Sequence, residues 1–406
     1  MMAGLMSGVL LKTSLEVWGG TSLFFSLLLV LGVWRLRRTP PVPPREWPPI
    51  VILRPCEGNE PGLYENLLSS IHAPYPGPRR VFLLVPSAAD PAYPTLERVA
   101  KNTPPEIPVE VLLTRPEARH NRKVAQLSAG LLRSSEPIIV TADSDVQLGP
   151  DDLPTLVSLV CGPPSSPANR HTVGIAFASP IEQSPRTLWD RVSSALVGGS
   201  AQNFMALYGL YRLIGGVPSM SGALLAISRQ ALADIGGLHS VRTILGEDYE
   251  LARRFCAAGY SVEQSPLPAH CSDGGRSLRG VIARVGRWLM VVRAQRPLLL
   301  LTYPIFMAAT PPLLLASLCL RTPLLVAMTT TLLFSRTFLS WLLRRSQGIR
   351  RSFVESALEV LAAELLLWAG LLQALGTREV NWRGYRFRIA RGGHMIPETR
   401  TPSVQP

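Results

Sequence analysis

Long apolar runs lie near both ends of the chain, whereas the middle alternates short apolar runs with polar stretches. Residues 15–34 form a run about as long as a helix needs to cross a hydrocarbon core. Arg35, Arg37 and Arg38 follow at once, as in a stop-transfer sequence. Lys12 before the run also fits a cleaved signal peptide, but no A-x-A site follows. The pattern therefore predicts an N-terminal membrane helix followed by a cytosolic domain.

Two apolar segments near the C-terminus form a predicted helical hairpin. Residues 298–320 and 323–343 are separated by only two residues, and Pro311 and Pro312 are expected to kink the first arm. An arginine-rich stretch after the second arm is expected to lie on the cytosolic side.

A third apolar segment, residues 354–376, leaves its placement open. Charges at mid-bilayer cost roughly 2.5–3.5 kcal/mol each, so this segment either crosses, lies in the interface or packs against a neighbour. Its acidic residues are Glu355, Glu359 and Glu364. If it crosses, odd-even counting sends the tail outside, whereas the tail's arginines favour the inside. Those arginines are Arg378, Arg383, Arg386, Arg388 and Arg391.

The middle of the chain predicts an α/β domain with a mostly parallel sheet covered on both faces. Short apolar runs that end in turn signals predict strands, and runs of helical period predict helices between them. The expected strands are 49–55, 81–85, 109–113 and 137–142, with helices at 63–71 and 123–133. Ligands of such sheets bind at the carboxyl ends of the strands.

These patterns divide the chain into five parts. The parts are an N-terminal transmembrane helix (1–38), a proline-rich linker (39–49), the α/β domain (50–297), C-terminal transmembrane or interfacial helices (298–376) and a basic tail (377–406). Residues 195–218 are glycine-rich and apolar, and are expected either to line the access of a lipid acceptor or to form ordinary packed helix.

Composition supports attachment to a membrane. Hydrophobic residues make up 47% and charged residues 17%, against about 25% charged in ordinary soluble proteins. This excludes a disordered chain, a coiled coil and a purely soluble enzyme. The net charge is +13 and the arginines cluster beside apolar segments, which favours anionic lipid over nucleic acid as the partner. Five scattered cysteines indicate neither a disulfide framework nor a zinc site, and suit a reducing compartment.

Two acidic motifs are candidates for chemistry. Asp143-Ser144-Asp145 follows a predicted strand, and two such carboxylates suit a divalent ion shared with a diphosphate, although a simple turn explains them as well. Glu247-Asp248 begins a predicted helix. Acids there are usually caps, and the functional alternative is a general base for an acceptor hydroxyl.

Two basic motifs complete the candidates. One face of a predicted helix carries Arg284, Arg287 and Trp288. These side chains are expected to anchor the helix at the membrane interface, to clamp a leaving diphosphate, or to do both. Lys123, in Asn121-Arg122-Lys123, begins another predicted helix. It is expected either to contact a phosphate or base or to be an ordinary surface charge.

Taken in chain order, these motifs resemble a known series. Asp90 and the three motifs at 143–145, 247–248 and 284–288 are similar to the D, D-x-D, D, (Q/R)-x-x-R-W series of inverting, membrane-bound family 2-like glycosyltransferases with a GT-A fold. The ceramide glucosyltransferase family is the closer match, with a single N-terminal membrane helix and an Arg-type R-x-x-R-W. Its further blocks appear at residues 55–67, 90–92, 121–123 and 382–388, so the resemblance covers residues 15–393.

The resemblance implies a role for each candidate residue. Asp90 and Lys123 would contact the uridine of a UDP-sugar, and Asp143 and Asp145 would hold the ribose or a metal. Asp248 would be the catalytic base. The residues implied to hold the diphosphate and acceptor are Arg284, Arg287 and Trp288.

The implied reaction is an inverting transfer of a hexose, with glucose favoured, to the hydroxyl of a membrane lipid, with ceramide favoured. Ceramide enzymes often have D-S-G where this chain has the full D-x-D of residues 143–145, which favours Mg²⁺ or Mn²⁺ as cofactor. The arginine-rich, lysine-poor composition fits a bacterial source, and the arginines that follow the N-terminal helix place the catalytic domain on the cytosolic side of its inner membrane. Bacterial relatives also glycosylate hopanoids or other lipids, so another UDP-sugar such as UDP-GlcNAc and another lipid stay as alternatives. A processive polysaccharide synthase is disfavoured because it usually has Gln in Q-x-x-R-W and more helices.

Overall fold

The computed structural model describes most of the chain. The described residues are 2–36, 40–58, 60–117, 120–162, 172–183, 185–272, 274–382 and 385–397. Of the residues used above, Arg37, Arg38 and Arg383 lie outside this part.

The chain forms two compact units, each discontinuous in sequence. An α/β unit comprises Arg38–Ser184, Val217–Gly274 and Arg378–Pro406, and a helical unit comprises Met1–Arg37, Pro185–Gly216 and Gly275–Thr377. Residues 185–216 therefore fold with the apolar ends of the chain, and the basic tail folds with the α/β unit.

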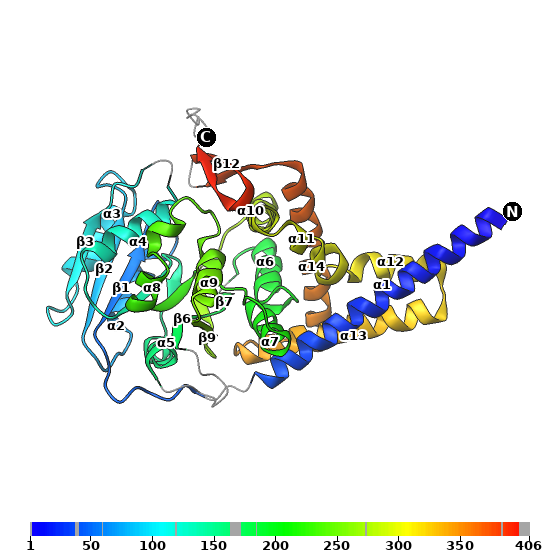
Figure 1. The fold of residues 1–406 in the computed structure, drawn as a ribbon, viewed down its shortest axis with the longest axis horizontal. Helices are drawn as coiled ribbons and strands as arrows, with labels where there is room; N and C mark the ends of the chain where they lie inside the picture. Colours follow the sequence, from blue (N-terminus) through cyan, green and yellow to red (C-terminus); the bar gives the residue numbers. More distant parts are fainter. Residues whose placement is uncertain are drawn as a thin grey trace. The chain divides into compact units, whose positions relative to one another are not determined.

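The α/β unit is built on a mostly parallel sheet (Figure 1). Among the described residues it has seven strands in the order β3-β2-β1-β4-β8-β6-β9. β8 is antiparallel to both of its neighbours, and the other pairs are parallel. The strands are β1 (Ile50–Pro55), β2 (Arg79–Val85), β3 (Val109–Leu113), β4 (Ile138–Ala142), β6 (Val173–Phe177), β8 (Leu224–Ser228) and β9 (Ser261–Gln264).

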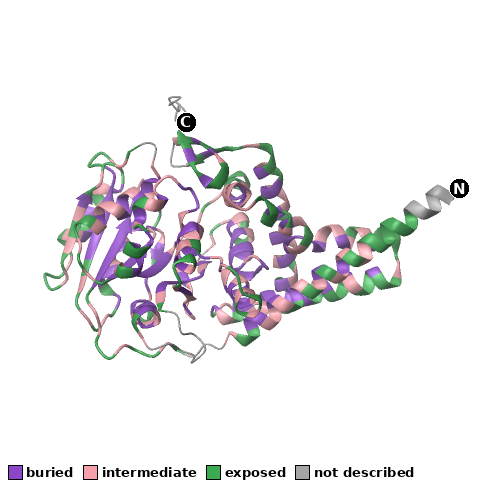
Figure 2. Cartoon of the chain, in the orientation of Figure 1, coloured by how far each residue is buried: buried purple, intermediate pink, exposed green. Residues whose placement is uncertain are grey.

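Helices cover both faces of the sheet, as the unbroken apolar strands predict. Every residue of β1 and β4 is buried, and these strands show as purple arrows in Figure 2. One face of the sheet packs against α2, α3 and α5 in a single apolar core. On the other face Gly130 of α4 lies against Leu53 and Leu84. The helices of this unit are α2 (Leu63–His72), α3 (Tyr93–Lys101), α4 (Arg122–Leu132), α5 (Asp152–Cys161), α8 (Arg229–Asp234) and α9 (Glu247–Ala257).

Two small sheets complete the α/β unit. One contains β5 (Val146–Gln147), β7 (Pro180–Glu182) and β10 (Ala269–Cys271). The other is formed by the tail, from β11 (Glu379–Trp382), β12 (Tyr385–Ile389) and β13 (Met395–Pro397). The tail bonds to the segment before α9, because Met395 N donates to Thr243 O at 2.8 Å and Leu245 N donates to Gly393 O at 3.0 Å.

The helical unit contains the apolar runs. Among the described residues, Gly8–Arg35, Pro323–Ser346 and Phe353–Gly376 are long and apolar enough to cross a membrane, and Pro297–Met307 with Thr310–Leu320 forms a pair bent by 47°. The helices are α1 (Met2–Arg35), α6 (Leu188–Gly199), α7 (Phe204–Ile214), α10 (Leu278–Gln295), α11 (Pro297–Leu300), α12 (Thr310–Leu320), α13 (Pro323–Ser346) and α14 (Phe353–Gly376), with a π-helical turn at Tyr303–Met307.

The predicted kink in residues 298–320 is confirmed, because Pro297–Met307 and Thr310–Leu320 are bent by 47° at a break that lies just before the two prolines. The helix breaks after the π-helical turn, and Pro311 and Pro312 lie within the first turn of α12. Proline is tolerated there because first-turn N–H groups have no partner within the helix. The break is stabilised by other helices: Trp368 donates to Ala308 O at 2.8 Å, and the Glu364 carboxylate accepts from Thr310 N at 2.8 Å.

Candidate functional site

Lys123 lies among carboxylates at the edge of the sheet where β4 ends. Its Nζ is 2.6 Å from Asp143 Oδ1 and 3.8 Å from Glu247 Oε1, and it donates to Gly222 O at 2.9 Å. These residues come from α4, the end of β4, the start of α9 and the segment before β8. The fold thus joins two motifs and a lysine that are widely separated along the chain.

Asp248 and Lys123 both bond to the backbone of Gly222. Its Oδ2 accepts from Gly222 N at 3.2 Å and its Oδ1 from Tyr249 N at 2.8 Å, while the N-cap of α9 is Gly246. A Cβ on Gly222 would lie 3.1 Å from Lys123 Nζ and 3.4 Å from Asp248 Cβ. Only glycine therefore lets the lysine and the carboxylate meet here without displacement.

Glu247 has different partners from Asp248. Its Oε2 accepts from Asn121 Nδ2 at 3.0 Å, and Asn121 is also the N-cap of α4, where its side chain accepts from Val124 N. Glu247 therefore links the start of α9 to the start of α4, which orients Lys123.

Burial perturbs all three ionisable groups. It raises the pKa of Glu247 to about 7, against the opposing effect of Lys123. Burial also raises the pKa of Asp248, opposed by the N–H of Tyr249 and by Lys123. Burial alone would lower the pKa of Lys123, but Asp143 and Glu247 outweigh it, so this pKa is raised and the ammonium stays charged. A cationic centre beside acids of raised pKa is typical of a functional site.

Hydrogen bonds hold the Asp143-Ser144-Asp145 turn at both ends. Asp143 N donates to Ala223 O at 2.9 Å, and Ser272 N donates to Asp145 O at 2.7 Å. Asn66 Nδ2 donates to Ser144 O at 3.1 Å. These bonds all reach backbone atoms of the turn, so they fix the main chain from which the two carboxylates project.

Arg54 lies beneath this turn and is completely buried in β1. Its Nη2 donates to Val146 O at 2.8 Å, and its Nε and Nη1 have no hydrogen-bond partner in the described part of the chain. Burial lowers its pKa, and nearby negative groups that include Asp145 and Asp143 oppose this shift. Arg54 is therefore a buried positive charge under the acidic turn.

Asp90 stabilises the loop that follows β1. Its Oδ1 accepts from Gly58 N at 2.8 Å and from Ala92 N at 2.9 Å. In the same loop Glu57 pairs with Arg122 at 2.7 Å, and the Arg122 guanidinium lies 4.5 Å from the ring centroid of Tyr385 in the tail. The loop, the start of α4 and the tail sheet are thus linked around Lys123.

The R-x-x-R-W motif forms the expected helix face, within the helical unit. It lies in α10, where the Arg284 guanidinium is 4.7 Å from the ring centroid of Trp288 one turn later. Arg284 Nη1 also lies 3.5 Å from Ser193 Oγ of α6. Arg287 belongs to the same helix.

Among the described residues there is no group of three or more His, Cys, Asp or Glu that could hold a metal. Asp143 and Asp145 are two carboxylates on one turn, and Mg²⁺ commonly takes one or two carboxylates and completes its shell with phosphate oxygens and water. The donor set therefore fits a metal that arrives with a diphosphate.

A sequence model of glycosyl transferase family 21 matches residues 21–395 of this chain. The chain therefore belongs to glycosyl transferase family 21. The predicted membership of a glycosyltransferase family is confirmed, and so is the predicted α/β class, with a mostly parallel sheet and long apolar helices from both ends of the chain.

Curated relatives of this family-21 chain are ceramide glucosyltransferases. Ceramide glucosyltransferase 1 of Caenorhabditis elegans is 22% identical over 269 residues, which cover 66% of this chain and 55% of the relative. Ceramide glucosyltransferase 3 of the same organism is 22% identical over 355 residues, covering 86% and 74%. The match to the first of these spans about half of its length.

Solved structures with a similar fold are more distant. A mannosyltransferase of Pyrobaculum calidifontis, solved with GDP-Man and Mn²⁺, is 16% identical with a TM-score of 0.48, covering 89% of this chain and 99% of that one. Glucosyl-3-phosphoglycerate synthase of Mycobacterium tuberculosis, solved with Mn²⁺ and UDP, is 16% identical with a TM-score of 0.38, covering 61% and 79%.

Three residues that shape the site were missed by the sequence reasoning. Arg54 did have a signal, because it is the one charge in the apolar run 49–55. Gly222 is one of 32 glycines, and Tyr385 lies within the 382–388 block but far along the chain from Arg122, so nothing in the sequence indicated the contact that either of them makes.

Proposed function

We propose that this family-21 member transfers a hexose, with glucose favoured, from a UDP-sugar to the hydroxyl of a membrane lipid, with ceramide favoured. The observation that carries the proposal is the cluster of Lys123, Asp143 and Asp248 around Gly222. It places a cation suited to a nucleotide phosphate beside a carboxylate of raised pKa suited to a hydroxyl proton. The names of the curated relatives support ceramide as the acceptor.

Asp248 is proposed as the general base. A base must be partly unprotonated at working pH and yet basic enough to accept a proton, and burial moves the pKa of this carboxyl upward toward that range. The bonds from Gly222 N and Tyr249 N fix the direction of its oxygens.

The donor side is proposed to use Lys123, Asp143 and Asp90, as the resemblance implies. Asp90 and Lys123 would contact the uridine. Arg284 and Arg287 would neutralise the diphosphate as it leaves, and stabilisation of developing charge usually contributes more to catalysis than any other single effect. Trp288 holds Arg284 by stacking, which suits a clamp formed by Arg284 and Arg287.

Asp143 and Asp145 are proposed to hold Mg²⁺ or Mn²⁺. The metal would supply further neutralisation of the leaving diphosphate. Asp143 lies 2.6 Å from Lys123, so the proposed metal and the lysine would both contact this carboxylate.

The protein is proposed to be an integral protein of a bacterial inner membrane with a cytosolic α/β unit. The long apolar helices support membrane attachment, and Arg35 at the end of α1 favours the cytosolic side for the residues that follow.

The test is transfer by membranes that contain the full-length protein. Radiolabelled UDP-glucose, UDP-galactose and UDP-GlcNAc are supplied separately with ceramide or a hopanoid, and lipids are separated by chromatography. We expect label in glucosylceramide, and none with the Asp143→Asn variant. The matched control is Asp234→Asn, which changes an exposed acid of the same unit and should leave transfer intact. Label in no lipid from any donor would contradict the proposal.

A further inference from the structure

α14 has the length and composition of a membrane-spanning helix, but the direction of its neighbours bears on whether it crosses. α1 and α13 lie side by side and run in the same direction. Gly19 of α1 lies against Leu325 and Met328 of α13, and further along both helices Ser26 Oγ is 2.8 Å from Ser335 Oγ.

This shared direction places the end of α13. α1 ends at Arg35, and the chain then continues into the α/β unit. If α1 and α13 both cross the membrane, the C-terminal end of α13 lies on the same side as the α/β unit. Arg344 and Arg345 at that end agree with this, since arginines accumulate on the cytosolic side.

The residues after α14 also belong to that side. The tail that follows α14 is hydrogen-bonded into the α/β unit through Gly393 and Met395. A folded unit lies on one side of a membrane only, so α14 both starts and ends on the side of the α/β unit. The chain between Gly275 and Thr377 must then cross the membrane an even number of times. Residues 297–320 and α13 supply two crossings.

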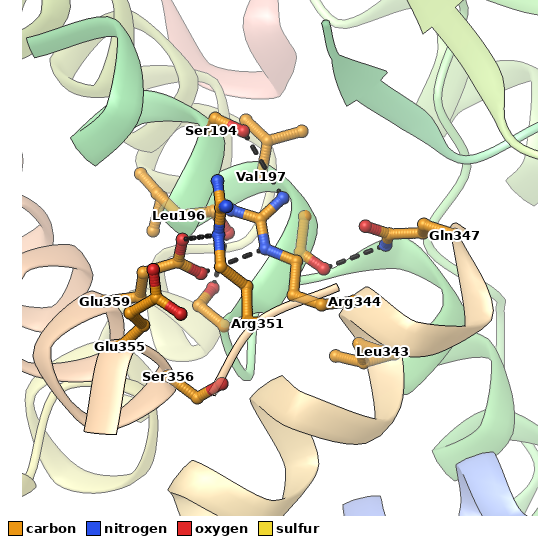
Figure 3. A network of polar contacts seen from close by, with 12 residues as sticks. Ser194, Leu196, Val197, Leu343, Arg344, Gln347, Arg351, Glu355, Ser356 and Glu359 are labelled. Atoms are coloured by element: carbon orange, nitrogen blue, oxygen red, sulfur yellow. Dashed lines mark hydrogen bonds and ion pairs between the residues drawn. The ribbon is translucent and has the colours of Figure 1, made fainter. Parts of the chain in front are cut away.

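The charged residues of α14 agree with a position at the membrane surface. Glu359 accepts from Arg344 Nε and from Arg351 Nε, each at 3.0 Å (Figure 3). Arg293 of α10 donates to the carbonyl of Ala374 at the other end of α14. Arginines therefore contact the helix near both of its ends, which agrees with two ends on the cytosolic side.

The outward face of α14 is a continuous apolar stripe. In Figure 1, α14 runs across the shared direction of α1 and α13. The exposed side chains recur at helical spacing along its whole length, and each is more than half exposed. They are Val354, Leu358, Leu365, Leu372 and Leu375.

We propose that α14 lies along the cytosolic surface of the membrane and embeds this stripe in the lipid. The partner is the boundary between headgroups and acyl chains, where apolar helix faces are buried about 5–10 Å deep. Glu364 faces the protein, because its carboxylate accepts from Thr310 N and Thr310 Oγ1. The stripe itself carries no charge, so α14 holds the helical unit against the bilayer without crossing it.

Spin labels on the stripe test the depth of α14. Each of the five stripe residues is replaced singly by a labelled cysteine in the full-length protein, with exposed native cysteines removed, and the protein is reconstituted in vesicles of phosphatidylethanolamine and phosphatidylglycerol. Collision with oxygen and with a nickel chelate then gives the depth of each label. We expect five similar shallow depths, whereas a crossing helix would place Leu365 on the order of 15 Å deeper than the ends.

Labels at Leu324 and Phe334 of α13 are the matched control, and should differ in depth because that helix crosses. A second readout uses an impermeant maleimide on Arg350→Cys before α14 and Ile396→Cys in the tail, both exposed positions. We expect both to react from the side of the α/β unit. The proposal would be overturned by reaction of the two cysteines from opposite sides or by a depth maximum at Leu365. It would also be overturned if a second copy of the protein shielded the labels from oxygen.

Discussion

Glu247 and Asp248 are adjacent in the chain, but their partners predict different consequences of mutation. Glu247 contacts Asn121 and Lys123 at the start of α4. Asp248 instead accepts hydrogen bonds from the backbone N–H groups of Gly222 and Tyr249. The proposed base is therefore the residue whose carboxylate is directed by the main chain.

Asp248→Asn separates a base from a helix cap. Asn caps helices about as well as Asp, so a capping role predicts near-normal turnover and little loss of stability. A base role predicts a loss of turnover on the order of 10²–10⁴, the usual contribution of a positioned base. Donor binding should survive, measured by equilibrium binding of UDP-sugar. Turnover within about tenfold of wild type with normal donor binding would make Glu247 the next candidate.

Gly222→Ala tests the close approach of Lys123 and Asp248. The added methyl would lie 3.1 Å from Lys123 Nζ, so one of the two side chains must move by a few tenths of an ångström. We expect turnover to fall by about tenfold or more with the fold intact, because small misplacements of catalytic groups are costly. Steady-state rates and circular dichroism measure the two effects.

The matched control is Gly149→Ala, whose methyl would make only an ordinary contact of 3.5 Å with Asp152. It should keep wild-type turnover. Equal rates in both alanine variants would show that the approach at Gly222 is unimportant.

At the scale of elements, the turn after β4 carries Asp143 and Asp145, the proposed metal ligands. EDTA should abolish transfer and added Mn²⁺ or Mg²⁺ should restore it, and Asp145→Ala should abolish it with the fold intact. Asp151→Ala is the control, because Asp151 is exposed and makes no side-chain bond as the N-cap of α5. Full activity in the presence of chelator would exclude the metal role.

Asp190 of α6 joins the two points where the chain enters the helical unit. Its carboxylate accepts from Thr187 N at 2.9 Å and Arg186 N at 3.0 Å, and also from Gly275 N at 2.8 Å and Arg276 N at 3.1 Å. Burial alone would raise its pKa, but these N–H groups together outweigh it and lower the pKa to about 2.

The lowered pKa gives Asp190 a pH-dependent contribution to stability. The carboxylate stabilises the fold fully above its unfolded pKa of about 3.9, and this contribution is lost as pH falls through its folded value. Asp190→Asn should therefore lower the free energy of unfolding by about 1–3 kcal/mol near neutral pH. Thermal unfolding in detergent should show the difference shrinking as pH falls below about 4. A difference that is constant with pH would contradict this assignment.

At the scale of the whole molecule, the side of the α/β unit decides whether a nucleotide donor can reach the site. Cys161 at the end of α5 is exposed and Cys256 of α9 is partly exposed. An impermeant maleimide should label them only after cells are permeabilised, as detected by mass spectrometry. Labelling in intact cells would overturn both the cytosolic side and the UDP-sugar donor.

Much of the fold follows from local patterns. The predicted strands at 81–85, 109–113 and 137–142 agree with β2, β3 and β4, and the helix predicted at 354–376 agrees with α14. Hydrophobic period and turn residues act over a few residues, so a single sequence reports them well.

The bend in residues 298–320 shows how far local patterns reach. Pro311 and Pro312 correctly predicted a kink, which lies just before them, but not the side chains of α14 that bond the freed backbone groups. Such bonds come from residues far along the chain, which sequence period cannot reveal.

The sequence by itself determined the types of element, their order, the family and the acidic and basic motifs, because all of these depend on neighbouring residues. Only the tertiary structure decided what those motifs meet. It brought Lys123 to Asp143 and Gly222, and put the buried charge of Arg54 under the acidic turn. It also returned the tail to the α/β unit, which bears on how α14 meets the membrane. The physical reason is that these contacts join residues far apart along the chain, and only packing and backbone hydrogen bonds select them.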